Sequence, residues 1–290
     1  MPAPRLNSNS RLHHLSSPLP NRRGLDAFLT LLFRPRRAIL ATMQIGTWHI
    51  WPYTQRIVAG VIIALSWVWI MGPKRGFDRR RLIGLVWMLA VGALLGGRLG
   101  YVIEHVRYFT ERSGDIVTLR QTGGLHGVGA WLGGALALTI WSHFWGDALF
   151  PLLRLMLPAT LLVAAGAWWA CANAGCAWGQ EALNAPTALR WLVMDMPDLY
   201  HMVRPRYPVQ LIAALAALLM AGLAMLYPAH SYLFGAGYML GVAGVSLLRA
   251  DPVLMIGGYR LEGWMHLGLA LWLMGLYVKN STVGVQPGEN

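Results

Sequence analysis

The sequence predicts an all-α fold, a polytopic bundle of transmembrane helices with about seven spans, preceded by an N-terminal interfacial or re-entrant helix. Of the 290 residues, 56% are hydrophobic and 12% are charged, whereas a typical soluble domain carries about 25% charged residues. Several apolar stretches approach the ~20 residues that a helix needs to cross a bilayer. Charged, glycine-rich or proline-rich sequence separates these stretches, as expected for loops between spans.

Seven apolar segments are the expected spans. Each is bounded by charged residues or by glycine and proline, which end helices or turn the chain. In chain order the segments are residues 57–72, 82–106, 125–144, 155–176, 209–226, 232–248 and 261–278. We expect them to form one transmembrane domain over residues 38–280, followed by a short C-terminal tail at 281–290.

The N-terminal residues 1–37 differ from the rest of the chain. They are rich in Ser, Asn, Pro and Arg and contain a single acid, Asp26, which predicts a disordered basic tail. Residues 38–51 are apolar but too short for a full span, so they predict the interfacial or re-entrant helix. If this segment crosses the membrane instead, the bundle gains a span and the basic tail lies inside.

The basic residues indicate membrane orientation. The formal charge is +12, yet the basic side chains lie at segment ends and form no single patch, so we expect no nucleic-acid partner. Lys74, Arg75 and residues 79–81 fill the loop after the first span, which the positive-inside rule places in the cytoplasm. Counting spans from this loop places residues 104–124 and 178–208 outside.

The two cysteines and the missing motifs limit the possible chemistry. Cys171 and Cys176 both fall in the fourth predicted span. On a regular helix a spacing of five residues offsets them in angle, which predicts two buried thiols. The sequence has no Cys/His cluster at zinc spacing and no phosphate-binding nucleotide loop. We therefore predict no metal and no cofactor.

Arg98 lies in the second predicted span, within the glycine-rich run 96–101. An ionisable side chain at membrane depth is costly, so it faces protein or a wet cavity. A planar, permanently charged guanidinium suits phosphate, and the glycines let a ligand or another backbone approach. Two interpretations stay open: Arg98 binds a lipid headgroup, or it reaches the interface and pairs with Glu104 or another acid.

Two further motifs place polar residues at the start of a span. His126, in the glycine-rich run 123–129, could act as a general base because imidazole exchanges a proton near neutral pH. It could also simply cap the helix. Arg204 and Arg206 precede the fifth span on a proline-stiffened segment, and Gln210 lies in its first turn. These residues could clamp an anionic headgroup or form an ordinary basic helix entry.

These three motifs, in this order and on successive spans, resemble the prolipoprotein diacylglyceryl transferase family. The match comprises a Gly-Gly-Arg-x-Gly-Tyr run at 96–101, a Gly-Gly…His-Gly stretch at 123–127 and an Arg-x-Pro-x-Gln-Leu run at 206–211. Weaker similarities lie at 173–179 and 249–252, and the resemblance covers about residues 47–278.

The resemblance implies an activity and a set of site residues. In the family, the diacylglyceryl group of phosphatidylglycerol moves to the thiol of a lipobox cysteine at the outer face of the bacterial cytoplasmic (inner) membrane, releasing glycerol phosphate. A phosphatidylglycerol-like phospholipid is thus the expected partner. His126 is the catalytic candidate, although an ungapped count places the family histidine at Val128. The expected headgroup-binding residues are Arg98, Tyr101, Arg204, Arg206 and Gln210.

The sequence departs from the family at four charged positions. Alignment on the nearby Trp-Gly pair puts Trp168 where the fourth span carries its arginine and Cys176 where it carries its glutamate. Alignment on the arginine after the sixth span puts Val242 and Ser246 at another arginine and glutamate. Losing one preorganised electrostatic donor typically costs about 2.7–4 kcal/mol of transition-state stabilisation.

These departures favour a catalytically degenerate family member that acts as a lipid-binding scaffold or as an accessory subunit beside other membrane subunits. The alternative is an active transferase in which His126, Arg98 and Arg206 take over the missing roles. A transporter is the third hypothesis. It would require broken helices with paired acids and bases at mid-membrane, and the predicted spans hold few such residues beyond Arg98 and Arg154.

Overall fold

The computed structural model describes residues 43–45, 48–50, 52–119, 123–198 and 200–283. These residues all belong to one unit, Met43–Asn290. The basic tail predicted at residues 1–37 lies outside the described residues. So does most of the predicted C-terminal tail, although the last helix continues through its first residues to Val283.

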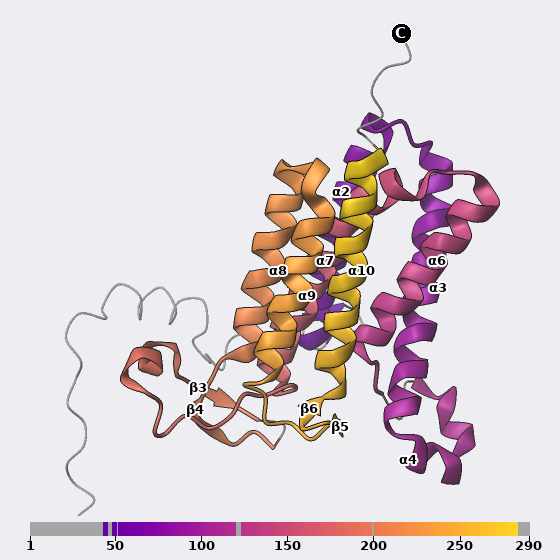
Figure 1. Cartoon of the computed structure of the whole chain (residues 1–290). Helices are drawn as coiled ribbons and strands as arrows, with labels where there is room; N and C mark the ends of the chain where they lie inside the picture. The colour runs from indigo at the N-terminus through magenta and orange to yellow at the C-terminus, as the bar shows by residue number, and fades with distance from the viewer. Residues whose placement is uncertain (1–42, 46–47, 51, 120–122, 199, 284–290) are drawn as a thin grey trace, which may run out of the picture. The chain divides into compact units, whose positions relative to one another are not determined.

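Seven helices of at least 16 residues run between two common ends of the described bundle (Figure 1). They are α2 (Pro52–Lys74), α3 (Arg79–Glu104), α6 (Gly127–Trp145), α7 (Leu149–Ala174), α8 (Val209–Leu226), α9 (Ser231–Ser246) and α10 (Leu261–Val283). Each overlaps one predicted span. Five of them, α2, α3, α7, α8 and α10, are long and apolar enough to cross a membrane by length and composition. The prediction of a polytopic helical bundle is confirmed.

The two ends of the bundle differ in content. At one, residues 75–78 join α2 to α3, and we call it the basic-loop end. At the other lies the arm, residues 178–208, which contains the short helix η2 (Thr187–Leu192) and the antiparallel strands β3 (Met194–Pro197) and β4 (Val203–Arg206). The arm end also holds α4 (Val106–Glu111), η1 (Ser113–Ile116) and the hairpin of β5 (Met255–Ile256) and β6 (Tyr259–Arg260). At the basic-loop end, η3 (Pro228–His230) joins α8 to α9.

The N-terminal interfacial or re-entrant helix expected at residues 38–51 is not what the described part of that segment forms. Met43–Ile45 (β1) and Trp48–Ile50 (β2) pair as antiparallel strands. The segment is too short for a stable helix and is rich in isoleucine and tryptophan, which favour extended backbone. Its apolar composition was therefore a poor guide to secondary structure.

Close glycine contacts hold neighbouring helices together. On α3 and α6, a Cβ added to Gly96 would lie 2.3 Å from the carbonyl oxygen of Gly129, and one added to Gly133 would lie 2.1 Å from that of Gly92. On α2 and α7, the same test at Gly60 gives 2.9 Å to the oxygen of Leu162. Small residues at such crossings are typical of membrane helices, where close backbone packing drives association. The glycines of the 96–101 run thus allow α6 to pack closely against α3.

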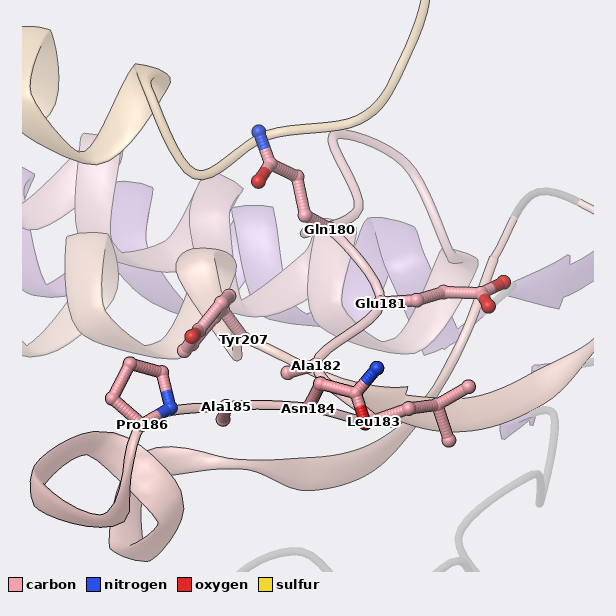
Figure 2. Close-up of a pocket in the computed structure, with 8 residues that line it drawn as sticks. All are labelled: Gln180, Glu181, Ala182, Leu183, Asn184, Ala185, Pro186 and Tyr207. Atoms are coloured by element: carbon pink, nitrogen blue, oxygen red, sulfur yellow. The ribbon is translucent and has the colours of Figure 1, made fainter.

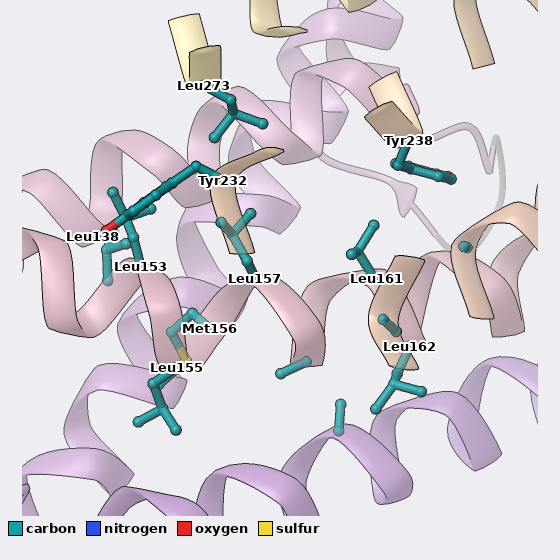
Figure 3. Packing of buried hydrophobic residues seen from close by; sticks show 14 of the residues in the cluster. Leu138, Leu153, Leu155, Met156, Leu157, Leu161, Leu162, Tyr232, Tyr238 and Leu273 are labelled. Carbon is teal, nitrogen blue, oxygen red and sulfur yellow. The ribbon is translucent and has the colours of Figure 1, made fainter. Parts of the chain in front are cut away.

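Helix α7 supplies more residues to the buried core than any other helix. Leu152, Leu155 and Leu161 are fully buried, and α7 contacts α2, α8 and α9. Figure 3 shows the α7 leucines facing side chains from other helices, including Leu273 of α10, which meets Leu157 at Gly235. A helix that is apolar on every side belongs in the interior of a bundle.

Candidate functional site

His126 lies immediately before α6 and is held against α3. Its backbone N–H donates to the carbonyl of Gly97 at 2.8 Å. Its ring packs on Gly100, where an added Cβ would lie 2.9 Å from the Cβ of His126. The histidine is only 6% exposed. The glycine-rich run of α3 therefore provides the surface on which His126 packs.

The contacts of His126 define where its ring proton lies. Nδ1 accepts the backbone N–H of Gly129 at 3.1 Å, so the side chain caps α6. In the neutral ring the proton is then on Nε2, which lies 3.7 Å from Oε1 of Glu262. The capping interpretation is observed, and the nitrogen facing Glu262 is a hydrogen-bond donor in this tautomer.

Glu262 connects His126 to a group of charges that we call the Arg249 cluster: Arg249, Asp251, Arg260 and Glu262. Arg249 donates through Nη1 to Glu262 and through Nε and Nη2 to the two carboxylate oxygens of Asp251, at 2.9 and 2.6 Å. Arg260 donates to the side chain and backbone of Asp251 at 3.1 and 2.9 Å. Two cations and two anions thus balance where α9 ends and α10 begins.

The cluster affects its two arginines in opposite directions. Burial disfavours charge on Arg249, but the hydrogen bond to Asp251 and the charge of Glu262 outweigh it and raise the pKa of Arg249. Burial, followed by the positive charge of Arg249, lowers the pKa of Arg260. Both guanidinium groups remain charged near neutral pH because arginine is not deprotonated in proteins. Arg249 is the more firmly held cation.

Glu104, the last residue of α3, completes a triad with His126 and Glu262. Their potential ligand atoms all lie within 4.8 Å of one another. A metal ion on Nε2 of His126 would require that nitrogen to lose its proton, which conflicts with the capping bond from Gly129. A substrate oxygen that accepts the Nε2–H fits the observed tautomer better than a metal.

Arg98 lies on α3, directly after Gly97, which accepts the backbone N–H of His126. Its guanidinium donates hydrogen bonds to backbone carbonyls. It donates to Ile116 at 2.7 Å, to Asp115 at 2.5 Å and to Gly124 at 3.2 Å, and it also donates to the carbonyl of Gly123. The residue is 6% exposed. Arg98 therefore fastens residues 115–124 to α3, and a headgroup would have to compete with these carbonyls.

Tyr101 forms the other side of this contact. Its ring lies 4.2 Å from that of His105 and 5.7 Å from the guanidinium of Arg98, measured to ring centroids. An added Cβ on Gly124 would lie 2.3 Å from the ring of Tyr101, and Gly124 has a φ of +82°. Both the close contact and the left-handed backbone require glycine there. Tyr101 thus packs against the chain before His126.

Arg206 and Arg204, predicted to bind a headgroup, pair with acids of the arm. Buried Arg206 donates through Nη2 to Glu181 and Asp198 at 3.2 and 3.1 Å, and through Nη1 to the carbonyl of Gly179 at 3.3 Å. Its Nε has no partner among the described residues. The more exposed Arg204 donates to the other oxygen of Glu181 at 3.2 Å. One guanidinium is therefore interior to the arm and the other faces outward.

Gln210 lies in the first turn of α8 and is 1% exposed. Its Nε2 donates to the carbonyl of Cys176 at 2.9 Å, while its Oε1 is buried without a partner in the part of the chain that the structure describes. In this structure the side chain therefore holds the turn that follows α7.

The prediction of two buried thiols is wrong, because Cys171 and Cys176 form a disulfide with a Cα–Cα distance of 4.9 Å. The angular argument assumed that a regular helix continues to Cys176. Instead α7 ends at Ala174, and Gly175 adopts the left-handed conformation with φ of +71°. This turn brings Cys176 back over the last helical turn, within disulfide distance of Cys171.

A short extended segment of the arm, residues 178–182, connects the two groups of charges. On one side, Gly179 pairs with Arg249, and the backbone N–H of Ala250 donates to Trp178 at 2.9 Å. On the other side, Glu181 pairs with Arg206. The structure thus links His126, through Glu262 and Arg249, to Arg206.

The arm also carries a shallow cavity of about 350 Å³, formed by residues 180–186 together with Tyr207 (Figure 2). None of the six predicted site residues lines it. The predicted residues therefore lie at one end of the bundle in two linked groups, rather than around this cavity.

Uncharged side chains occupy three positions where the family resemblance implied charge. Trp168 donates through Nε1 to the hydroxyl of Tyr238 at 2.9 Å, and the guanidinium of Arg249 lies 5.9 Å from the Trp168 ring centroid. Val242 is 2% exposed and belongs to the core. Ser246 donates to the carbonyl of Ala243 at 2.7 Å. The guanidinium of Arg249 therefore lies close to the position where the resemblance implied the fourth-span arginine.

Sequence reasoning missed Arg249, Asp251 and Glu262 as members of the site. The signal was their position: each is an ionisable residue at the border of an apolar span, where charge is costly unless paired. The run at residues 249–252, after the sixth span, shows only a weak similarity to the family. Glu262 lies far from the three glycine-rich or proline-rich motifs in sequence, so nothing local related it to His126.

Comparisons with known proteins point to one family. Residues 40–279 match the family model for prolipoprotein diacylglyceryl transferase. A phosphatidylglycerol–prolipoprotein diacylglyceryl transferase from Synechocystis sp. is 32% identical over 51% of this chain and 50% of its own length. Proteins with the same name from Corynebacterium glutamicum and Nostoc sp. are 24% and 27% identical, over 75% and 86% of this chain and 76% and 91% of their own lengths. The chain belongs to the prolipoprotein diacylglyceryl transferase family.

Proposed function

We propose that this chain is a membrane transferase that moves the diacylglyceryl group of phosphatidylglycerol to a cysteine thiol of a prolipoprotein. The observation that carries the proposal is the contact of Glu262 with both His126 and Arg249. It places a cation, a ring N–H and carboxylates together near positions where the family charges are missing. The two substrates, phosphatidylglycerol and a prolipoprotein, are taken from the names of the similar proteins.

The proposed chemistry assigns a role to each group of the site. A carbon–sulfur bond forms between the cysteine and the glyceryl carbon as that carbon's bond to the phosphate oxygen breaks. Arg249 and the Nε2–H of His126 stabilise the charge that develops on the leaving glycerol phosphate. Glu104 or Glu262 receives the thiol proton, because only the thiolate is a good nucleophile. Atoms and charge balance without a cofactor.

This assignment changes the role expected for His126. As a base it would need a free nitrogen lone pair, and the lone pair of Nδ1 accepts the N–H of Gly129. As a donor it keeps that capping bond. We further propose that the arm end faces the outside of the bacterial cytoplasmic membrane, because the basic loop lies at the opposite end of the bundle.

The test is an assay of the purified full chain with phosphatidylglycerol and a lipobox peptide. We expect a thioether-linked diacylglyceryl peptide, with transfer reduced about 10²–10³-fold by Arg249→Gln, the usual cost of removing one electrostatic donor. Arg107→Gln, which neutralises an exposed arginine at the same end, should leave transfer unchanged. No transfer by wild type in several lipid compositions would contradict the proposal.

A noncatalytic lipid-binding scaffold or accessory subunit of a membrane complex is the second candidate. It is favoured by the apolar residues Trp168 and Val242 at positions of family arginines, and by the pairing of Arg206 with arm acids. Under this alternative the wild type retains phosphatidylglycerol through purification but forms no lipidated peptide. Detection of retained lipid by native mass spectrometry beside the assay separates the two candidates.

A further inference from the structure

The basic-loop end, which is the opposite end of the bundle from His126, contains two arginines with unpaired nitrogens. No described residue accepts a hydrogen bond from these nitrogens. Arg75 follows α2, and Arg154 lies in the first turns of α7. Nη1 and Nη2 of Arg75 and Nε of Arg154 are buried and have no hydrogen-bond partner within the described ranges. A buried N–H group without a partner costs about 1–3 kcal/mol, and more when it is charged.

Aromatic side chains surround these cations. The guanidinium of Arg75 lies 5.6 Å from the ring centroid of Trp67, whose Nε1 donates to the carbonyl of Leu155 at 3.1 Å. Arg154 interacts electrostatically with the hydroxyl of Tyr232, which donates to the carbonyl of Phe150 at 2.7 Å. These contacts hold the arginines in place, but neither aromatic group neutralises a positive charge.

Among the residues that the structure describes, no acid of this end pairs with Arg75 or Arg154. Asp147 accepts hydrogen bonds from Arg81 at 3.5 Å and from the indole of Trp141 at 2.9 Å. Asp78 is exposed and enters no ion pair that joins described residues. Burial and then the positive charge of Arg154 lower the pKa of Arg75. Two partly buried cations thus repel each other where unpaired charge is costly.

We propose that Arg75 and Arg154 form a binding site for a phosphate-type oxyanion. Guanidinium groups donate several N–H bonds in a plane, which matches the oxygens of a phosphate group. The orphaned nitrogens supply the donors, and Trp67 and Tyr232 flank the site. The ligand is the phosphodiester of an anionic lipid or inorganic phosphate. This site is separate from the transfer chemistry and does not depend on it.

The first experiment measures lipid retention by the full chain. The protein is purified in a mild detergent with phosphatidylglycerol, and bound lipid is counted by native mass spectrometry. We expect Arg75→Gln and Arg154→Gln each to reduce retention of phosphatidylglycerol at least tenfold at matched lipid concentration, or to abolish stabilisation by added inorganic phosphate. Arg80→Gln, an exposed arginine of the same end, is the matched control. Equal behaviour of all three variants would overturn the proposal.

A second measurement keeps the proposal testable if a variant folds poorly. The melting temperature of wild type should rise with added phosphatidylglycerol or phosphate, and that rise should vanish in Arg75→Met. If the pair binds no anion, removing one of two repelling cations should instead raise the melting temperature without any added ligand, and this would contradict the proposal.

Discussion

Oε1 of Glu262 lies 3.7 Å from Nε2 of His126, while its Oε2 accepts a hydrogen bond from Arg249. One carboxylate at the start of α10 therefore faces a histidine of α6 and an arginine that follows α9. Two groups, the ring of His126 and the guanidinium of Arg249, therefore share this carboxylate. Under the proposed function, Glu262 supplies the carboxylate that the family resemblance implied at Cys176 or Ser246.

Glu262→Gln should therefore lower transfer to a lipobox peptide by about two orders of magnitude, since Arg249 and His126 lose the charge that positions them. The protein should still fold, because the amide keeps the shape of the side chain. Asp195→Asn, on an exposed arm acid, is the control. Normal transfer by Glu262→Gln would remove this residue from the proposed chemistry.

Arg98→Ala should act mainly on stability. Its guanidinium donates to carbonyls of Asp115, Ile116, Gly123 and Gly124, and carbonyls left buried without donors cost about 1–3 kcal/mol each. We expect a large fall in melting temperature and faster proteolysis near residues 115–124, against little change in a variant of Lys74. If Arg98→Ala melts normally but loses phosphatidylglycerol, direct headgroup binding by Arg98 is the better interpretation.

Gly133→Ala should loosen the contact between α3 and α6. The new methyl group would lie 2.1 Å from the carbonyl oxygen of Gly92, so the helices must separate and His126 moves with α6. Gly134→Ala is a matched control because nothing lies within 4 Å of its added Cβ. Thermal unfolding of both variants tests this, and equal melting temperatures would argue against the packing described.

The disulfide between Cys171 and Cys176 should contribute to stability. By the loop-entropy relation, closing a loop of this length is worth about 2 kcal/mol. Replacing both cysteines by serine should lower the melting temperature, and a reductant should have that effect only on wild type. Mass spectrometry after alkylation gives an independent reading: without reductant, a protein that takes up two alkyl groups would contradict the disulfide.

Hydrophobicity and spacing predicted the helical bundle because membrane spans are set by local composition. The same logic failed at the N-terminal segment, where Met43–Ile45 and Trp48–Ile50 pair as strands, since apolar composition alone does not distinguish a short helix from a hairpin. It also failed at Cys176, because the end of α7 depends on one left-handed glycine.

The site was predicted in part for a similar reason. The motifs around Arg98, His126 and Arg206 are local and could be read from the sequence, and their residues do lie at one end of the bundle. The contact of His126 with Glu262 joins positions separated by most of the helical domain, so only tertiary packing could reveal it. The hydrogen bonds of Arg98 to backbone carbonyls could not be predicted either, because they depend on a loop whose sequence has no regular pattern.

The backbone pairing of Gly179 with Arg249 has a mechanical consequence. Gly179 also packs against the end of the arm, since an added Cβ would lie 2.0 Å from the carbonyl oxygen of Tyr207. The backbone of the arm is therefore in direct contact with the segment that carries Arg249. A displacement of the arm backbone would therefore act directly on the backbone of Arg249, whose side chain pairs with Glu262 beside His126.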